Sequence, residues 1–347
     1  MDGYFHRVRR QTGTRFWINN PTGEEIDWAL AAGAISCTTN PAYCARLLAS
    51  EPDYVNGLID TVIREIPDCE GAAPVVYQRS AQRLLERFLP SYERSGGRSG
   101  FVTLQDDPRR EDDADSVIRF AVENSRLGPN VMAKIPVIQS GLEAIEGCVA
   151  RNIPICATEV FSISQAIHVD ERYRKAASRT GNHPPLSITH ITGIFDEYLR
   201  KTAAREGIAI SDGVISQAGC AVARKQYGIL RQRGSDVTML GGGARSPGHF
   251  TEFVGGDIHI TINWSTAAEL IQRDPPVESR IDAGTPEAVL EQLSAAFPDF
   301  DKAYRDDGLD VSEFADYGPV QLFRNMFLDG WYTLLAAISR RKSMQAR

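Results

Sequence analysis

Short apolar runs alternate along this chain with longer segments in which apolar residues recur every three or four positions. The runs have the length of buried strands, and the longer segments have the periodicity and surface charge of helices. Eight strand-like runs occur in order. They span residues 15–19, 34–38, 101–105, 131–135, 153–158, 186–192, 236–240 and 257–263.

Helix-like segments lie between these runs, among them residues 24–32, 113–126, 141–151 and 163–178. Alternation of strand and helix indicates parallel β-α units. Eight units predict an α/β protein of the closed (β/α)8 TIM-barrel type, whose reactive residues gather at the carboxyl ends of the strands. An open, doubly wound sheet is the competing architecture, but it usually has a glycine-rich turn after its first strand. Here that position holds Asn19-Asn20-Pro21-Thr22-Gly23.

Two regions fall outside the alternation. Residues 52–97 are long and mostly helical, which predicts an insertion packed on a barrel core of residues 15–272. Residues 286–345 predict C-terminal helices, and the aromatic segment 320–338 predicts a helix packed over the barrel, a lid or a dimer contact. We expect the whole chain, residues 1–347, to form a single domain.

Composition narrows the class of protein. The 347 residues are 42% hydrophobic and 24% charged, as in soluble globular proteins. The net charge of −7 argues against a nucleic-acid partner. No run approaches the roughly 20 apolar residues of a membrane span, and the N-terminus lacks the apolar core of a signal peptide. The six cysteines are scattered, which predicts reduced thiols without a metal site. We therefore expect a cytoplasmic protein.

Lys134 lies inside the apolar run Val131-Met132-Ala133-Lys134-Ile135-Pro136-Val137. A lysine rarely enters a dry strand without a partner or a purpose. Burial disfavours the ammonium form and lowers the pKa, and a neutral amine can form a Schiff base with a carbonyl substrate. The structural alternative is an edge-strand lysine whose amine reaches solvent.

Polar residues stand at the ends of the other strand-like runs, and a barrel would bring them around Lys134. They are Asn19, Thr38, Thr39, Asn40, Gln105, Thr158, His190, Arg245 and Asn263.

The sequence resembles the transaldolase family of Schiff-base aldolases, over about residues 16–268. The resemblance rests on four blocks: Thr38-Thr39-Asn40-Pro41, the Lys134-Ile135-Pro136 strand with its helix, the unit from Ile153 through Phe161-Ser162, and the segment from Gly243-Ala244-Arg245 to Ile262. It implies an α/β barrel, no cofactor and no metal. It also implies association through barrel faces and C-terminal helices, so a homodimer is expected.

The resemblance assigns roles to individual residues. Lys134 would be the Schiff-base nucleophile, and Thr158 would orient the water that shuttles protons. Arg245 would grip a substrate phosphate, because a guanidinium offers a fork of donors at fixed charge. The substrate-binding positions are Thr39, Asn40, Cys156, Ser162, Arg245 and Ser246.

Four positions depart from the family pattern. Asn19 replaces the aspartate that exchanges the donor hydroxyl proton, and an amide cannot exchange a proton near pH 7. Gln105 replaces a glutamate, although some aldolases of the wider family have glutamine there. Cys156 replaces a donor-binding asparagine. Ile194 replaces a second phosphate-binding arginine.

His190 is the predicted replacement acid or base, because an unperturbed histidine titrates near neutral pH. The alternative is a packed neutral histidine beneath a loop. Asp106-Asp107 is a second source of a carboxylate, or else a solvated loop before a helix.

Together these features predict an enzyme of carbohydrate metabolism, of the kind found in the pentose phosphate pathway. It would transfer a dihydroxyacetone-type unit between sugar phosphates, or release that unit as a lyase, through a Schiff base on Lys134. The substitutions Asn19, Gln105 and Ile194 suggest a specialised carbonyl substrate, a small ketose or aldose. The alternatives are a catalytically impaired barrel that binds a sugar phosphate as sensor or scaffold, and a barrel whose lysine holds pyridoxal phosphate.

Overall fold

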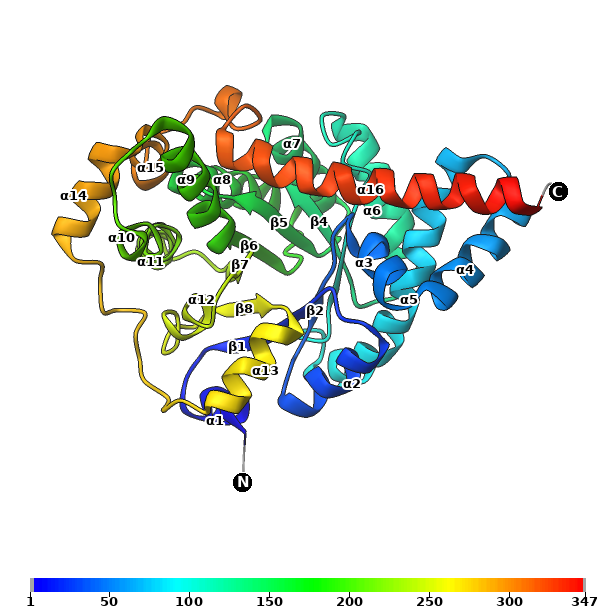
Figure 1. Cartoon of the computed structure of the whole chain (residues 1–347), viewed down its shortest axis with the longest axis horizontal. Helices are drawn as coiled ribbons and strands as arrows, with labels where there is room; N and C mark the ends of the chain where they lie inside the picture. The colour runs from blue at the N-terminus through cyan, green and yellow to red at the C-terminus, as the bar shows by residue number, and fades with distance from the viewer. Residues whose placement is uncertain (1–2, 346–347) are drawn as a thin grey trace.

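Parallel strands close into a barrel at the centre of the molecule (Figure 1). The computed structural model describes residues 3–345, and within them eight strands pair in chain order, with β8 closing against β1. The strands are β1 Arg15–Asn19, β2 Cys37–Thr38, β3 Val102–Gln105, β4 Val131–Pro136, β5 Ile155–Val160, β6 Leu186–Ile191, β7 Thr238–Gly242 and β8 His259–Ile262. The predicted (β/α)8 TIM barrel is confirmed. That the whole chain is one domain stays a prediction.

Helices follow the strands and surround the barrel. In chain order they are α1 Tyr4–Gln11, α2 Gly23–Ala32, α3 Tyr43–Ser50, α4 Pro52–Glu65, α5 Cys69–Ser95, α6 Ala114–Ser125, α7 Gln139–Ala150, α8 Ile163–Thr180, α9 Gly193–Glu206, α10 Asp212–Ile215, α11 Ala218–Gln232, α12 Gly248–Thr251, α13 Trp264–Arg273, α14 Glu287–Ala296, α15 Pro298–Tyr304, the 3-10 turn η1 Val311–Glu313 and α16 Gly318–Gln345. The predicted insertion corresponds to α4 and α5, which pack against each other and against α3.

Local sequence sets the helix ends near the site. The Thr22 hydroxyl accepts the backbone N–H of Glu25, and the Glu25 carboxylate accepts the N–H of Thr22, so α2 begins with a capping box. It ends at Gly33, whose φ of 103° suits only glycine. Tight ends of this kind bring the chain back to the next strand within a few residues.

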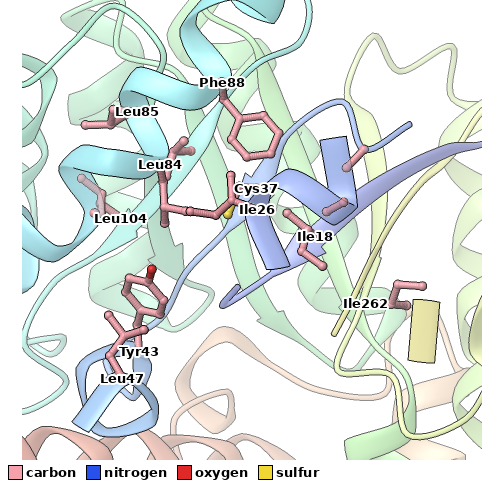
Figure 2. Close-up of a cluster of buried hydrophobic side chains, with 14 of the residues drawn as sticks. Ile18, Ile26, Cys37, Tyr43, Leu47, Leu84, Leu85, Phe88, Leu104 and Ile262 are labelled. Atoms are coloured by element: carbon pink, nitrogen blue, oxygen red, sulfur yellow. The ribbon is translucent and has the colours of Figure 1, made fainter. Parts of the chain in front are cut away.

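Apolar side chains fill both the barrel and the layer between strands and helices. Figure 2 shows part of the outer layer, with Cys37 of β2 beside Ile26 of α2 and Phe88 of α5. Inside the barrel, Trp17, Met132 and Leu240 belong to a smaller apolar cluster. This inner cluster fills the barrel beneath the polar strand ends.

The last helix, α16, crosses the barrel (Figure 1) and contacts α3, α4, α5, α9 and β5. Gly330 allows a close approach, because a Cβ there would lie 2.5 Å from the Cα of Ala42. The helix therefore covers the strand ends, in agreement with the first of the three readings of residues 320–338, a helix packed over the barrel. No helix within residues 3–345 is long and apolar enough to cross a membrane.

Candidate active site

Lys134 lies on β4 and faces the carboxyl end of the barrel. The residue is 6% exposed, and its Nζ donates a hydrogen bond to the backbone carbonyl of Thr39 at 3.1 Å. The Nζ also lies 5.6 Å from the centre of the Phe327 ring. Burial lowers the pKa of the amine, because the charged form loses its hydration. The side chain is thus biased toward the neutral, nucleophilic form.

A cavity of about 210 Å³ opens above this lysine at the strand ends. Its polar walls come from six different strands. They are formed by Asn19, Thr38, Lys134, Thr158, Thr189 and Thr261. A concave site with a few convergent polar groups is the usual form of a small-molecule site, and this one lies at the barrel face where such sites occur.

A chain of hydrogen bonds fixes the wall formed by β1, β2 and β8. The Asn19 Nδ2 donates to the Oδ1 of Asn263, and the Thr38 hydroxyl donates to the Oδ1 of Asn19, both at 2.8 Å. The Thr38 and Thr261 hydroxyl oxygens lie 2.6 Å apart. Both ends of the Asn19 amide are therefore engaged, and the residue acts as an anchor in this wall.

Five residues with a predicted catalytic or binding role line the cavity together: Asn19, Asn40, Lys134, Thr158 and Arg245. The predicted strand-end residues Thr38 and Asn263 line it too. The others lie around it. Gln105 and Thr39 contact groups at its base, and Ser246 lies beside Arg245 on the loop after β7. The catalytic and binding roles of all these residues stay predictions.

Three of these surrounding residues have local structural partners. The Thr39 hydroxyl donates to the carbonyl of Thr103 at 2.6 Å. Cys156 belongs to the inner apolar cluster, and its Sγ lies 3.2 Å from the Thr189 hydroxyl. Ser162 is the N-cap of α8 and forms a capping box with Gln165. These contacts place Cys156 and Ser162 beneath and behind the cavity wall.

His190 lies on the opposite side of β6 from the cavity. Successive side chains of a strand face opposite sides, and Thr189 is the residue that faces inward. The His190 ring is fully buried, its Nδ1 lies 3.0 Å from the Gln226 Oε1 of α11, and burial lowers its pKa to about 4. The expectation that His190 supplies an acid or base on the active face is wrong in position, because its ring packs between the barrel and a helix.

An irregularity in β5 brings an unexpected carboxylate toward the lysine. Ala157 pairs with Ile188 but Val160 pairs with His190, so β5 contains one extra residue. Glu159 adopts a left-handed φ of 60° at this bulge, which is uncommon for a residue with a Cβ. Its Oε1 accepts a hydrogen bond from the Gln105 Nε2 at 3.0 Å.

Among the described residues, one carboxylate oxygen of Glu159 has a hydrogen-bond partner and the other has none. The Glu159 Oε2 and the Thr158 hydroxyl are buried and have no hydrogen-bond partner among the described residues. Burial raises the pKa of Glu159 to about 7, against the opposing effects of Gln105, Lys134 and Arg324. Unpaired buried polar groups are costly, and they concentrate where function requires them.

A second buried glutamate lies close by. The Glu111 Oε1 lies 2.6 Å from the Arg324 Nε of α16, and the Glu111 Oε2 has no hydrogen-bond partner among the described residues. Burial and the charge of Glu159 raise the pKa of Glu111 to about 9, while Arg324 opposes this. Two interacting carboxyls titrate as a pair, and this pair retains a proton near neutral pH.

The loop after β7 presents a guanidinium to the cavity. The Arg245 Nε pairs with Glu197 at 3.0 Å. The His249 Nδ1 accepts the backbone N–H groups of Arg245 and Ser246 at 3.1 and 3.2 Å, so its proton lies on Nε2. That Nε2 donates to Asp196 at 2.9 Å. A buried histidine–aspartate pair thus holds this loop in place.

Sequence reasoning missed Arg46 of α3, which also lines the cavity. Its Nη2 contacts both carboxylate oxygens of Glu25, at 2.7 and 2.8 Å. It also missed Glu159, because strand alternation directs that position outward from a regular β5. Arg46 follows the Thr38-Thr39-Asn40-Pro41 block by five residues, which was its only sequence signal.

Helix α16 supplies the cover of the site. Phe323, Met326 and Phe327 line the cavity opposite the strand ends. The Phe327 ring lies next to the Lys134 Nζ and so contributes to the burial that lowers the pKa of the amine. Within residues 3–345, no three His, Cys, Asp or Glu side chains are grouped to hold a metal ion.

The fold and the cavity define a (β/α)8 barrel with a buried lysine amine on the fourth strand. The family model for Transaldolase/Fructose-6-phosphate aldolase matches residues 16–315. The chain therefore belongs to the transaldolase/fructose-6-phosphate aldolase family, as the resemblance predicted.

The sequence identity to individual members of the family is low. The chain is 26% identical over 210 residues to a transaldolase of Mycobacterium ulcerans strain Agy99, covering 57% of this chain and 55% of the relative. It is 27% identical over 231 residues to transaldolase 1 of Streptomyces avermitilis, covering 62% and 60%. The matched region thus spans little more than half the length of these relatives.

Proposed function

We propose that this protein makes or breaks a carbon–carbon bond next to a ketone through a Schiff base on Lys134. The observation that carries the proposal is the buried amine at the base of the cavity, together with a Thr158 hydroxyl that has no hydrogen-bond partner within residues 3–345. A desolvated amine is neutral over a wider pH range than free lysine, and the neutral form attacks carbonyl carbon.

The chemistry begins with attack of the Lys134 Nζ on the ketone, which gives a carbinolamine. Loss of water then gives an iminium, and this cation withdraws electrons from the neighbouring carbon–carbon bond. Thr158 faces the same cavity and can pass protons between the carbinolamine oxygen and a second group. Phe323 and Phe327 keep bulk water away from the iminium, which water would otherwise hydrolyse.

The substrates in this proposal are sugar phosphates that exchange a dihydroxyacetone-type unit. Arg245 and Arg46 line the cavity and can each bind an anionic group. Ile194 also lines it, so an apolar wall stands where the family has a second phosphate-binding arginine. This wall favours an acceptor with less charge at that end. The proposal includes the homodimer expected from family resemblance.

Asn19 favours a second candidate function. Its amide is held at both ends by Asn263 and Thr38, and it has no proton to exchange during carbon–carbon cleavage. A barrel that binds a sugar phosphate as sensor or scaffold would retain the cavity and the two arginines without needing this proton transfer.

Reductive trapping tests the proposal. Borohydride reduction in the presence of fructose 6-phosphate or dihydroxyacetone should add the mass of the reduced ketone to the wild type, measured on the intact protein. Lys134→Met removes the amine but keeps an unbranched apolar stem of similar length. It should give no adduct.

Lys225→Met is the matched control, because Lys225 lies on α11 and pairs with Asp306 away from the cavity. It should trap the ketone as the wild type does. An adduct on Lys134→Met, or none on the wild type with a panel of ketones, would contradict the proposal. The second outcome would favour the sensor, which binding of fructose 6-phosphate without an adduct would support.

A further inference from the structure

The hydrogen bond between Gln105 and Glu159 crosses a strand. Gln105 lies on β3 and Glu159 on β5, and β4 separates these two strands in the barrel. Gln105 is the register partner of Lys134, so both residues face the barrel interior. A bond from Gln105 to β5 on this side must pass over β4 close to Lys134.

The β5 bulge makes this reach possible. In a regular strand, Thr158 and Glu159 would face opposite sides. The extra residue and the left-handed φ of 60° at Glu159 turn its side chain toward β3 while Thr158 still lines the cavity. Strained backbone at a non-glycine residue persists where the surrounding structure holds it, often at functional sites.

We propose that Glu159 exchanges protons with the imine site at Lys134, acting through the Thr158 hydroxyl. The inference rests on the proposed Schiff-base function. It assigns to β5 a carboxylic acid that β3 lacks, since Gln105 is an amide and cannot donate an acidic proton. Glu159 does not itself line the cavity. It therefore holds the proton and acts on the substrate only through Thr158, as a positioning residue.

The proton balance suits a desolvated site. Before reaction, a neutral amine and a neutral carboxylic acid carry no net charge. Attack on the ketone forms the C–N bond, and the nitrogen proton passes to the former carbonyl oxygen. The acid proton then joins that oxygen, the C–O bond breaks and water leaves. The products are an iminium cation and the Glu159 carboxylate, again neutral overall. Hydrolysis returns the proton along the same route.

The charged groups that face Glu159 are Lys134 from β4, Glu111 from the segment before α6, and Arg324 from α16. Burial favours the protonated form of Glu159, while the positive charges of Lys134 and Arg324 oppose it. The charge of Glu159 in turn raises the pKa of Glu111. The contact between Arg324 and Glu111 therefore links the covering helix α16 to the protonation of the two buried carboxyls.

Glu159→Gln tests the inference. Glutamine keeps the Cβ, the length and the strained backbone of glutamate but has no acid proton. The rate of adduct formation, measured by quenched cyanoborohydride trapping and intact mass, should fall about 10²–10⁴-fold. Glu146→Gln removes a carboxylate on α7 that is paired with Arg172 outside the barrel, and it should leave the rate unchanged.

A rescue variant separates chemistry from structure. Gln105→Glu combined with Glu159→Gln exchanges the acid and the amide across their hydrogen bond, and it should recover at least about tenfold of the lost rate. A purely structural role of Glu159 predicts no acid-dependent change in the pH profile. The wild-type rate should also fall above pH 7, where Glu159 loses its proton, and this fall should vanish in Glu159→Gln.

Two outcomes overturn the inference separately from the proposed function. If the wild type forms the adduct and Glu159→Gln forms it equally fast, the inference fails and the Schiff base stands. If the single variant is slow but the exchanged pair is no faster, with both folded by thermal melting, Glu159 is structural. A wild type that traps no ketone overturns the proposed function, and the inference falls with it.

Discussion

Asn19 is the residue at which this site departs most from ordinary aldol chemistry. Iminium formation and carbon–carbon cleavage need different proton transfers, and the anchored Asn19 amide can serve neither as acid nor as base. Asn19→Asp should therefore raise the rate of cleavage or transfer at least about tenfold and leave the trapping rate unchanged. Release of the aldehyde product from fructose 6-phosphate measures the first rate.

Asn20→Asp is the control for Asn19→Asp, because it adds the same charge one position further along the cavity wall. It should give no gain. Equal gains in both variants would show that negative charge alone is responsible, and no gain in either would mean that cleavage uses another base. The side-chain amide of Asn263 can flip so that its Nδ2 donates to the new carboxylate. The cavity wall should therefore tolerate the change.

The cavity-lining positions at strand ends were predictable from sequence where the strands are regular. Lys134 and Thr158 line the cavity, as alternation and family resemblance indicated. Glu159 was not predictable, because a bulge depends on pairing between distant strands and leaves no local pattern. His190 was misplaced for the related reason that the terminal residues of a strand face alternately in and out, and the sequence does not fix the register.

Among the elements, β1 has the predicted bounds, while β2 retains only Cys37–Thr38 of the predicted residues 34–38. Ile35 still donates its N–H to the carbonyl of Phe16 at 2.9 Å, but the segment is too irregular to form a longer strand. The covering role of α16 was one of three readings of residues 320–338. Contacts of α16 with β5 and α3 support the helix packed over the barrel, which amphipathic periodicity alone does not indicate. The lid and the dimer contact stay predictions.

Gly330 controls how closely α16 approaches the cavity wall. A Cβ at this position would lie 2.5 Å from both the Cα and the Cβ of Ala42, which itself lines the cavity. Gly330→Ala should therefore lower the free energy of unfolding by about 1–3 kcal/mol through overpacking, despite the better helix propensity of alanine. It should also raise the KM for substrate, since the helix must move away from the wall.

Gly57→Ala on α4 is the matched control, since a Cβ there meets nothing within 4 Å. Urea unfolding should show a gain of up to about 1 kcal/mol for this variant. If Gly330→Ala were as stable as Gly57→Ala, the close packing of α16 would not matter to stability.

At the scale of the whole molecule, α16 joins the helical insertion to the barrel. Near its end, the Arg341 Nε donates to Asp60 of α4 at 2.8 Å, and near its start Arg324 pairs with Glu111 beside the site. Between these contacts, Phe327 lies over Lys134. The additions to the barrel thus complete the desolvated environment that the lysine amine requires.

Buried carboxyls also make the stability of the whole fold depend on pH. Asp106 accepts the backbone N–H of Asp107 through Oδ1, its Oδ2 is buried without a partner among the described residues, and burial raises its pKa to about 7. The folded state therefore binds this proton more tightly than the unfolded state. The stabilisation is complete below the unfolded pKa near 4 and is lost as the pH rises through 7.

Asp106→Asn removes this titration and keeps the shape and the Oδ1 acceptor. The free energy of unfolding of the variant minus that of the wild type should rise by about 2–4 kcal/mol between pH 4 and pH 8. Any fixed cost of the new amide is the same at both pH values and cancels from this change. Asp282→Asn, which alters an exposed carboxylate away from the buried carboxyls, should leave the difference flat. Urea unfolding at both pH values measures it. A flat difference for Asp106→Asn would mean that water reaches the Asp106 carboxylate and that burial does not hold its proton.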